Sequence, residues 1–446
     1  MSNLVAAIDL GTTKVVCLIG EKTASGVNIL AMSQMPSKGV SRGEVVNIKQ
    51  VMDSMLPTIR EVEEKSGQKI HEVYVGIAGQ NIRCEQSNDQ TIRVNPDELI
   101  SQKEIDVITE KMYGAFCQGG EEVLHAIPQS YNIDDFMGIT EPVGMIGKTI
   151  SSNFKLFIGK KASATFSNHV ITRANLKLRE LILEPLASAK AILSEEEMEV
   201  GVAMVDIGGG TTDLLIIQDG IIRHTAVIPF GGNSITEDIR MGCGISSKQA
   251  EALKISQGVC MSSRASEKKN IVISGFNGRE NKQISSKLLA SIIEARVSEI
   301  FEAVDYEIEK SGYKGVLKAG LVITGGTSLL PTIGSLAAMI TGLETRLAAP
   351  DSATGAIDIN QPALSTAVGL AIMGLENMEK HNLKGCTTPV NPQEESDNTA
   401  ENNGTTEDKK EENKKETPKE PKKERFSFSK LIKGLSNDSM FNDNDA

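Results

Sequence analysis

Two segments of the chain share one pattern, and this repetition constrains the fold more than any other feature. Residues 5–20 read VAAIDLGTTKVVCLIG, and residues 202–217 read VAMVDIGGGTTDLLII. In each segment an apolar run ends at an aspartate, a Gly/Thr turn follows, and a second apolar run begins. That order predicts a β-hairpin with the aspartate at the end of its first strand. The hairpins begin about 200 residues apart, which indicates a duplicated domain rather than a solenoid.

The segments between and after the hairpins predict a mixed α/β protein. A chain of 446 residues can bury two sizeable cores. We expect helices over residues 48–66, 101–117, 167–193, 234–240, 247–257 and 285–310. We expect strands over 73–77, 155–158 and 319–324, the last leading into the turn Gly325-Gly326-Thr327-Ser328. Ordered structure is expected to end near Met378.

The two Gly/Thr turns have the composition of a phosphate clamp. Glycine lets backbone N–H groups approach a phosphate closely, and small hydroxyl groups complete the set of donors. A magnesium ion needs oxygen ligands at the base of such a clamp, usually carboxylates reached through water. Asp9 and Asp206 are placed for this role, and Asp213 can assist. The phosphate-binding residues we expect are Gly11, Thr12, Thr13, Lys14, Gly208, Gly209, Gly210, Thr211 and Thr212.

A third glycine segment imitates a P-loop. Gly144-Met-Ile-Gly147-Lys148-Thr149 ends like that motif, but only two residues separate its glycines where a P-loop has four. We therefore expect a loop in a small subdomain.

The segments at Asp9, Asp206 and Gly325 resemble the phosphate 1, phosphate 2 and adenosine motifs of the actin–Hsp70–sugar kinase superfamily. The resemblance implies that ATP and Mg²⁺ lie between two RNase H-like domains, with the purine near Gly325, Gly326 and Thr327. Glu184 resembles the acidic residue of the first connecting motif, which orients the attacking water, and Asp213 could share that role. Glu251 and Lys254 match adenosine contacts of relatives; a plain surface or packing role is the alternative.

Five further stretches resemble the FtsA family of bacterial cell-division actin homologues. They are residues 73–82, 125–134, 142–145, 230–239 and 250–254, and the resemblance covers nearly all of residues 4–378. It implies two RNase H-like domains with an inserted subdomain 1C and a subdomain 2B. The expected bounds are 1–82 and 164–200 for 1A, 83–163 for 1C, 201–228 and 311–378 for 2A, 229–310 for 2B, 379–424 for a disordered linker, and 425–446 for a terminal amphipathic helix and tail.

By the same resemblance the chain polymerises on the cytoplasmic face of the inner membrane at the division site. It would anchor the division protein FtsZ there as a peripheral protein and recruit later division proteins. The C-terminal peptide of FtsZ would bind 2B near Arg296; a solvated or internally paired arginine is the alternative. A PilM-like pilus adaptor, a slow soluble ATPase and a sugar or acid kinase are the rival functions. The sequence offers no clear candidate for the catalytic aspartate that a kinase of this superfamily needs.

The C-terminal end changes composition at residue 391. From 391 to 424 only Ala400 is apolar, so this stretch is expected to be a flexible tether of roughly 30–35 Å. Beyond it Phe428, Leu431, Ile432 and Leu435 recur at helical spacing, beside Lys430 and Lys433. This pattern predicts a helix that lies on the membrane surface and binds reversibly, more firmly when many copies assemble. A helix that packs on the body or on a protein groove is the alternative.

Charge and cysteine content exclude other classes. The net charge of -12 argues against adhesion to nucleic acid. No run of about 18 apolar residues could span a bilayer, and the N-terminus lacks a secretory signal. The six cysteines form no CxxC pair, which indicates reduced thiols in a cytosolic protein.

Overall fold

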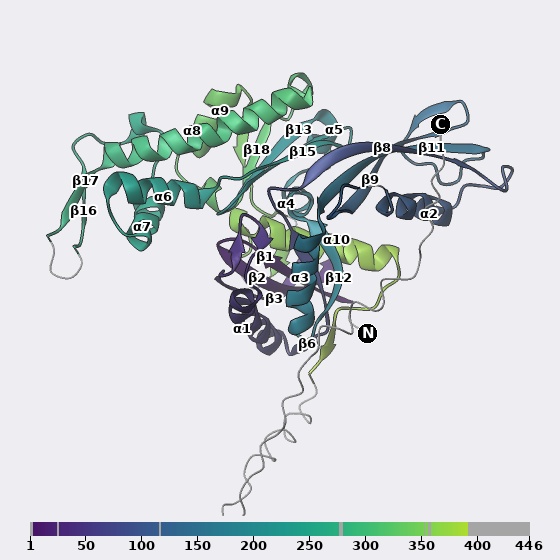
Figure 1. The fold of residues 1–446 in the computed structure, drawn as a ribbon, viewed down its shortest axis with the longest axis horizontal. Helices are drawn as coiled ribbons and strands as arrows, with labels where there is room; N and C mark the ends of the chain where they lie inside the picture. The colour runs from purple at the N-terminus through teal and green to yellow at the C-terminus, as the bar shows by residue number, and fades with distance from the viewer. Residues whose placement is uncertain are drawn as a thin grey trace, which may run out of the picture. The chain divides into compact units, whose positions relative to one another are not determined.

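The computed structural model describes residues 3–390, apart from 25, 116, 276–279, 352 and 356–357 (Figure 1). The expected membrane-binding residues Phe428, Lys430, Leu431, Ile432, Lys433 and Leu435 lie outside the described residues, as does the part of the expected linker after residue 390.

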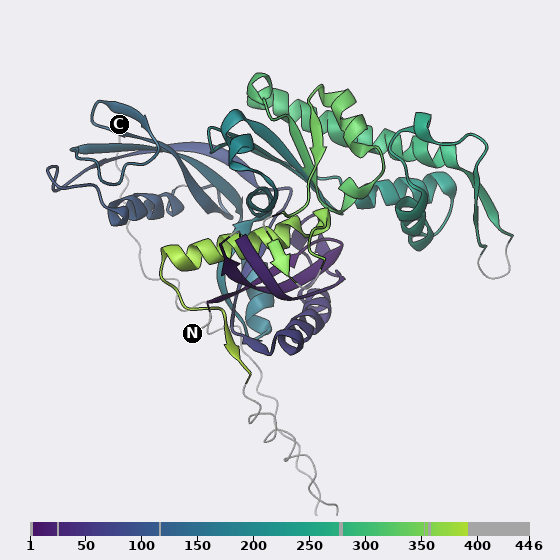
Figure 2. The ribbon, with the colours of Figure 1, turned by 180° about the vertical axis from the view of Figure 1, so that it is seen from behind.

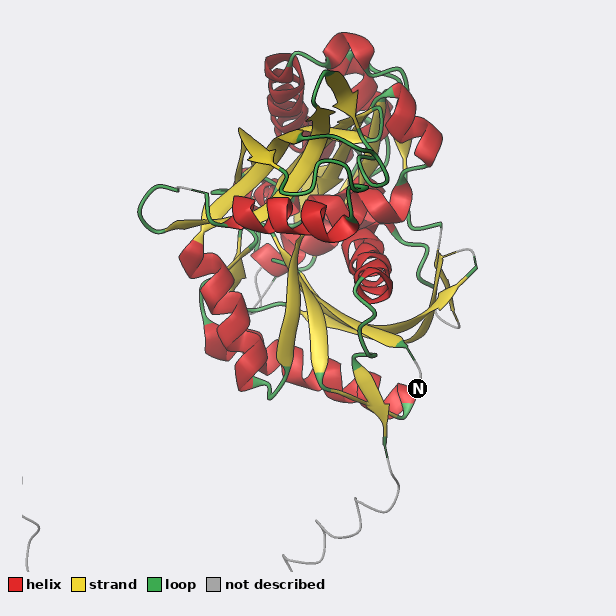
Figure 3. Cartoon of the chain, turned by 90° about the vertical axis from the view of Figure 1, so that its right-hand side faces the viewer, coloured by secondary structure: helices red, strands yellow, loops and turns green. Residues whose placement is uncertain are grey.

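Two sheets of the same topology form the centre of residues 3–390 (Figure 3). The first runs β12 (Lys177–Leu183), β7 (Glu72–Ile77), β1 (Leu4–Leu10), β2 (Lys14–Thr23), β3 (Gly26–Pro36) and β20 (Ala353–Gly355). The second runs β19 (Thr345–Leu347), β18 (Leu321–Thr324), β13 (Val202–Ile207), β14 (Thr212–Gln218) and β15 (Ile221–Ile228). In both, three consecutive strands (β1–β3 and β13–β15) pair antiparallel, and two further strands pair in parallel beside the first of them. This shared order confirms the duplicated domain.

Helices cover the first sheet on both faces (Figure 2). On one face α10 (Ser365–Lys380) packs on β1 and against α4 (Glu184–Ile192), and α1 (Ile48–Ser66) packs on β2 and β3 from the other. Every residue of β1 is buried, so this strand is the middle of a large apolar core.

A second core belongs to the other sheet. It includes side chains from α6 (Gly232–Cys243), α7 (Ser247–Gln257), the long α8 (Ser286–Ser311) and α9 (Ile333–Thr341). A small hairpin of β16 (Asn270–Ile273) and β17 (Lys282–Ser285) precedes α8. The second domain is therefore built around its own apolar core.

A third, antiparallel sheet has a core of its own. Its strands lie in the order β10 (Phe136–Ile139), β9 (Glu121–Ile133), β11 (Thr149–Lys160) and β8 (Arg83–Ile92). Helix α2 (Gln102–Tyr113) packs against β9, and Phe154 and Ile133 are fully buried beneath it. These residues form an inserted α+β unit between β7 and α3 (Lys161–Arg173).

One expected helix is wrong in its middle. Residues 167–193 form the end of α3, the strand β12, and then α4. The leucines, lysine, arginine and glutamate of β12 favour a helix locally, but the segment pairs in parallel with β7 at the edge of the first sheet. Sheet pairing overrides local propensity here, and Asn175, with φ +59°, turns the chain between the two elements.

The expectation that order ends near Met378 is also wrong. Helix α10 continues to Lys380, and β21 (Thr387–Pro389) then pairs antiparallel with β6 (Gln68–Ile70). Cys386 is buried, and its N–H donates to the carbonyl of Leu4 at 2.7 Å. These contacts offset the ordering entropy of the segment, so residues 379–390 belong to the body and not to the linker.

Candidate functional site

A cavity of about 360 Å³ lies between the two duplicated hairpins, a size typical of small-molecule sites. It is lined by both Gly/Thr turns and by residues of α4, α6 and α7. The turn after β18 and residues 362–366 complete the wall. Of the expected nucleotide and magnesium residues, all but Thr212 line it: Asp9, Gly11, Thr12, Thr13, Lys14, Glu184, Asp206, Gly208, Gly209, Gly210, Thr211, Asp213, Glu251, Lys254, Gly325, Gly326 and Thr327.

The two Gly/Thr turns meet across this cavity. A β-carbon placed on Gly209 would lie 1.8 Å from the Thr13 hydroxyl oxygen, a distance that no side chain tolerates. The Thr12 hydroxyl accepts a hydrogen bond from the Gly43 N–H at 3.1 Å. Glycine at 209 therefore allows the turns to approach each other.

Four carboxylates gather at the base of the cavity. Burial raises the pKa of Asp9 to about 6, with Lys14 opposing the rise and Asp206 adding to it. Burial, with a smaller contribution from the charge of Asp206, raises the pKa of Asp213 to about 7. Burial also raises the pKa of Glu184 well above its ordinary value, reinforced by the three aspartates.

Asp206 is the most firmly held of the four. Its Oδ2 accepts hydrogen bonds from Ser188 at 2.7 Å and Thr366 at 3.4 Å. Burial raises its pKa, while the Ser188 bond and the charge of Lys14 lower it. These bonds orient one carboxylate oxygen of Asp206 within the site.

Lys14 is a basic residue whose charge acts on Asp9 and Asp206. Its ammonium donates to the Ala363 carbonyl, and burial lowers its pKa, although Asp9 and Asp206 oppose that shift. One lysine cannot neutralise four carboxylates.

The carboxylate oxygens at the bottom of the cavity therefore fit a bound cation. Oδ2 of Asp213 accepts the Thr211 hydroxyl at 3.2 Å, but its buried Oδ1 has no partner within the described residues. Buried oxygens without partners are costly, and hard divalent cations prefer oxygen ligands. Across the described residues no three His, Cys, Asp or Glu side chains converge on one point as a metal-binding group, so water would complete any coordination sphere here.

The opposite end of the cavity is built from the second domain. Lys254 donates to the Gly232 carbonyl and the Thr236 hydroxyl, each at 2.9 Å, and pairs with Glu251 at 2.8 Å. The Thr327 hydroxyl donates to the Gly208 carbonyl at 3.0 Å, which ties the third glycine turn to the second hairpin. Glu251 and Lys254 thus lie at the cavity wall and also hold its structure.

Several lining residues were not expected from the sequence: Gly43, Gly232, Asn233, Ile255, Leu329, Leu330, Pro362, Ala363 and Thr366. The apolar residues among them make this end of the cavity hydrophobic, and Ile255 and Leu329 are largely exposed. Ser188 was not predicted from the sequence either, although it lies four residues after Glu184 and hence on the same helical face.

Thr212, which we expected among the phosphate-binding residues, does not line the cavity. It is fully buried, and its hydroxyl donates to the Phe230 carbonyl at 2.9 Å. Because neighbouring side chains on a strand point to opposite faces, Thr211 and Asp213 face the cavity while Thr212 faces away. It supports the hairpin and does not line the cavity.

Arg296 lies on α8 and is engaged within the chain. It pairs with Asp238 at 2.6 Å and with Glu299 at 2.6 Å, and its guanidinium lies 5.5 Å from the centre of the Phe230 ring. An incoming carboxylate would compete with Asp238.

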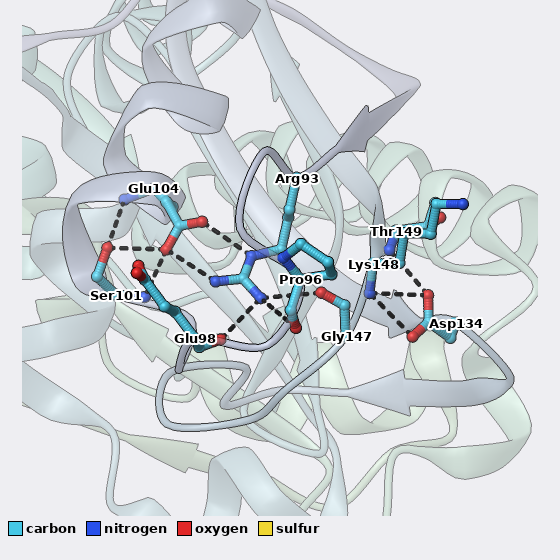
Figure 4. Close-up of polar contacts among 9 residues, drawn as sticks. All are labelled: Arg93, Pro96, Glu98, Ser101, Glu104, Asp134, Gly147, Lys148 and Thr149. Atoms are coloured by element: carbon cyan, nitrogen blue, oxygen red, sulfur yellow. Dashed lines mark hydrogen bonds and ion pairs between the residues drawn. The ribbon is translucent and has the colours of Figure 1, made fainter.

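The imitation P-loop is a structural turn. The N–H groups of Lys148 and Thr149 donate to the Asp134 carboxylate at 2.8–3.1 Å (Figure 4). Arg93, almost fully buried, binds the Gly147 carbonyl at 2.8 Å and Glu104 at 2.8 Å. The amides of Lys148 and Thr149 thus already have a carboxylate partner, and the segment is not a phosphate loop.

Comparison with known proteins decides the family. The chain is 36% identical over 375 residues to the cell division protein FtsA of Pseudomonas aeruginosa, covering 84% of this chain and 89% of that protein. It is 37% identical over 369 residues to FtsA of Neisseria meningitidis, covering 82% and 89%. This chain belongs to the FtsA family of cell division proteins.

Further matches agree with membership of the FtsA family. FtsA of Escherichia coli (strain K12) is 33% identical over 383 residues, covering 84% of this chain and 91% of that protein. The family model "Cell division protein FtsA" matches residues 203–369, and the model "SHS2 domain inserted in FTSA" matches residues 79–158.

Solved structures show that the fold is actin-like. A chain of the PilM–PilN type IV pilus biogenesis complex superposes with a TM-score of 0.59 at 13% identity, covering 83% of this chain and 98% of that one. MreB5 of Spiroplasma citri, in a structure bound to ADP, gives 0.50 at 16%, covering 85% and 97%. At these identities the likeness shows the fold alone. None of the helices described here is long and apolar enough to cross a membrane.

Proposed function

We propose that the cavity binds ATP with Mg²⁺ between the two domains. Backbone N–H groups and hydroxyls of the two turns would hold the phosphates, and Lys14 would approach them from β2. Asp9 and Asp206 would hold Mg²⁺ through water. The apolar end near Gly325, Gly326 and Thr327, with Glu251 and Lys254 beside it, would take the adenosine.

One observation carries this assignment: four carboxylates, those of Asp9 and Asp213 buried and those of Glu184 and Asp206 partly buried, line a cavity that also presents the donors of two glycine turns. Without a bound cation, the carboxylates at the bottom of the cavity would repel a polyphosphate. A divalent cation supplies the positive charge that lets carboxylates and phosphates share one site.

Glu184 and Asp213 are the residues we propose for orienting water if ATP is hydrolysed. Both belong to the group of carboxylates at the bottom of the cavity, and a bound cation would favour their charged forms. No further group in the described part of the chain points to fast turnover, so we propose a structural ATP-binding protein with slow hydrolysis at most. A slow soluble ATPase is the second candidate, favoured by the partly buried position of Glu184 on the cavity wall.

We propose that the chain polymerises on the cytoplasmic face of the inner membrane and there anchors FtsZ and recruits later division proteins. Membership of the FtsA family supports this role. Residues 425–446 would bind lipid, and the subdomain bounds stay as expected, except that the body extends to 390. Attachment would strengthen on assembly, because many weak helices on one filament act together.

Arg296 is the residue we propose for the acidic C-terminal peptide of FtsZ. Its bidentate pairing with Asp238 supports this, since the same guanidinium geometry recognises any carboxylate. Phe230 offers an apolar surface beside it.

Liposome flotation with fluorescent FtsZ tests the anchoring role. The full chain with Mg-ATP should carry FtsZ to the top of the gradient, and a chain lacking residues 425–446 should leave it below. If the full chain floats and FtsZ does not, the partner assignment is wrong. If the chain itself stays below, the membrane assignment is wrong and the soluble ATPase becomes the better account.

A further inference from the structure

A short hairpin lies against both Gly/Thr turns of the cavity. It consists of β4 (Val40–Ser41) and β5 (Glu44–Val45), joined by the two-residue turn Arg42-Gly43. Arg42 has φ +49° and Gly43 has φ +76°, the left-handed pair that a type I′ turn requires. We call this element the β4–β5 hairpin.

The tip of the β4–β5 hairpin contacts both Gly/Thr turns. The Gly43 N–H donates to the Thr12 hydroxyl of the first turn at 3.1 Å, and Gly43 lines the cavity. A β-carbon on Gly210 of the second turn would lie 3.1 Å from the backbone nitrogen of Arg42. The tip therefore lies where the two turns meet, which is the place that we propose for the phosphates.

Glu44 holds the hairpin on the body. Its Oε1 accepts hydrogen bonds from the Asn81 amide at 3.0 Å and from the Ser163 hydroxyl at 3.3 Å. A β-carbon on Gly79 would lie 3.1 Å from the same oxygen, so the chain before β8 packs closely against Glu44. These contacts set the position of the hairpin tip beside the cavity.

The Arg42 guanidinium has no acidic partner within the described residues. The residue is exposed, and its Nη1 donates to the neutral amide oxygen of Gln80 at 3.2 Å. It forms no ion pair with any residue that the structure describes. Residues other than glycine rarely take a positive φ, and such backbone conformations cluster at ligand-binding sites. Arg42 thus presents a free positive charge next to the two turns.

A bound triphosphate would need such a charge. Among the described residues, the basic side chains that line the cavity are Lys14 and Lys254. Lys254 already pairs with Glu251 at 2.8 Å, and the charges of Asp9 and Asp206 act on Lys14. A terminal phosphate adds negative charge to this acidic site, so a further cation beside the turns would stabilise it.

We propose that Arg42 binds the terminal phosphate of ATP, and that the Arg42-Gly43 turn is a third element of the phosphate clamp. The guanidinium exchanges the Gln80 oxygen for phosphate oxygens, which arginine binds through paired, charge-assisted hydrogen bonds. Arg42 therefore favours ATP over ADP. This inference rests on the proposed ATP site and adds the residue that distinguishes a triphosphate from a diphosphate there.

Calorimetric titration of ATP and of ADP into the full-length chain with Mg²⁺ tests this role. Arg42→Asn removes the guanidinium and gives the turn the sequence Asn-Gly, which type I′ turns prefer. The variant should therefore keep or raise the melting temperature of the ligand-free protein. It should weaken ATP binding at least about tenfold, as expected for loss of a hydrogen bond between charged groups, and leave ADP binding nearly unchanged.

Two further variants make the test specific. Arg42→Lys keeps the charge without the planar guanidinium, and it should recover part of the preference for ATP. Arg60→Gln is the matched control, because Arg60 is an exposed arginine of α1 that does not line the cavity. It should leave both affinities unchanged.

Three results would overturn the proposal. If the wild type binds ATP and Arg42→Asn binds both nucleotides as tightly, the ATP site stands and Arg42 has no part in it. If ATP and ADP weaken equally, the turn supports the cavity and does not recognise the terminal phosphate. If the wild type binds neither nucleotide, the ATP site itself is wrong, and the role of Arg42 is wrong with it.

Discussion

The Asp206 carboxylate lies directly against Gly325. A β-carbon on Gly325 would be 2.3 Å from Oδ1 of Asp206 and 2.5 Å from the Ile207 carbonyl oxygen. Gly325 also has φ +88°, a conformation that side chains disfavour. The third glycine turn therefore touches the second hairpin at the aspartate that we assign to Mg²⁺.

Gly325→Ala should weaken ATP binding at least about tenfold, because the methyl group must displace Asp206 or the turn. Fluorescent-nucleotide titration measures the loss. Gly342→Ala is the matched control: Gly342 has φ +69°, but a β-carbon there meets nothing within 4 Å. Equal ATP affinities in the two variants would show that the contact with Asp206 is irrelevant to binding.

Asp213→Asn should stabilise the ligand-free protein at pH 8. The pKa of Asp213 is about 7 when folded against 3.8 ordinarily, so the folded state holds its proton more tightly. The contribution of Asp213 to the free energy of unfolding is fully present below pH 4. It is lost as pH rises to 7 and above, a loss of up to about 4 kcal/mol. Asparagine does not ionise, so the variant does not lose this free energy as pH rises.

Thermal unfolding without nucleotide, at pH 5 and pH 8, measures that effect. The melting temperature of Asp213→Asn should exceed the wild-type value by several degrees at pH 8, and the difference should shrink at pH 5. A difference independent of pH would mean that Asp213 does not titrate in this range.

Arg296→Glu should abolish measurable binding of the FtsZ C-terminal peptide while ATP still binds. Asp238→Asn removes the internal competitor for the guanidinium and should tighten peptide binding by a factor of about 2–5. Fluorescence anisotropy with labelled peptide measures both. If Asp238→Asn and Arg296→Glu leave the affinity unchanged, the peptide binds elsewhere.

Ile432→Glu should reduce liposome binding by about tenfold or more, because a buried isoleucine contributes about 1.5–3 kcal/mol. Flotation of the full chain on anionic vesicles measures this loss. Ser436→Glu, the same change just beyond the apolar stripe, should have a much smaller effect. Equal losses would show that added charge, and not lost apolar contact, weakens binding.

The duplicated hairpins and most of the cavity could be predicted from the sequence, because they depend on short-range patterns. An apolar run that ends in an aspartate and a Gly/Thr turn predicts by itself where these side chains lie on a hairpin. The repetition of the pattern predicts that two such hairpins form one site. Thr212 could have been separated from Thr211 by strand alternation alone. Ser188 could have been found by its helical spacing from Glu184.

Other features depend on contacts between distant segments. The strand β12 has a helix-forming composition and becomes a strand only by pairing with β7. Cys386 is buried by the N-terminal strand, nearly the full length of the body away in sequence. Thr366 reaches Asp206 across 160 residues, and the pairing of Arg296 with Asp238 needs two helices to pack side by side.

Calorimetric titration of ATP into the full chain, with Mg²⁺ and then with EDTA, tests the central claim most directly. If the four carboxylates surround a magnesium–nucleotide site, ATP should bind with Mg²⁺ at least about tenfold more tightly than without it, and Asp206→Asn should remove most of that difference. ATP that binds equally well in EDTA, or does not bind at all, would contradict the account.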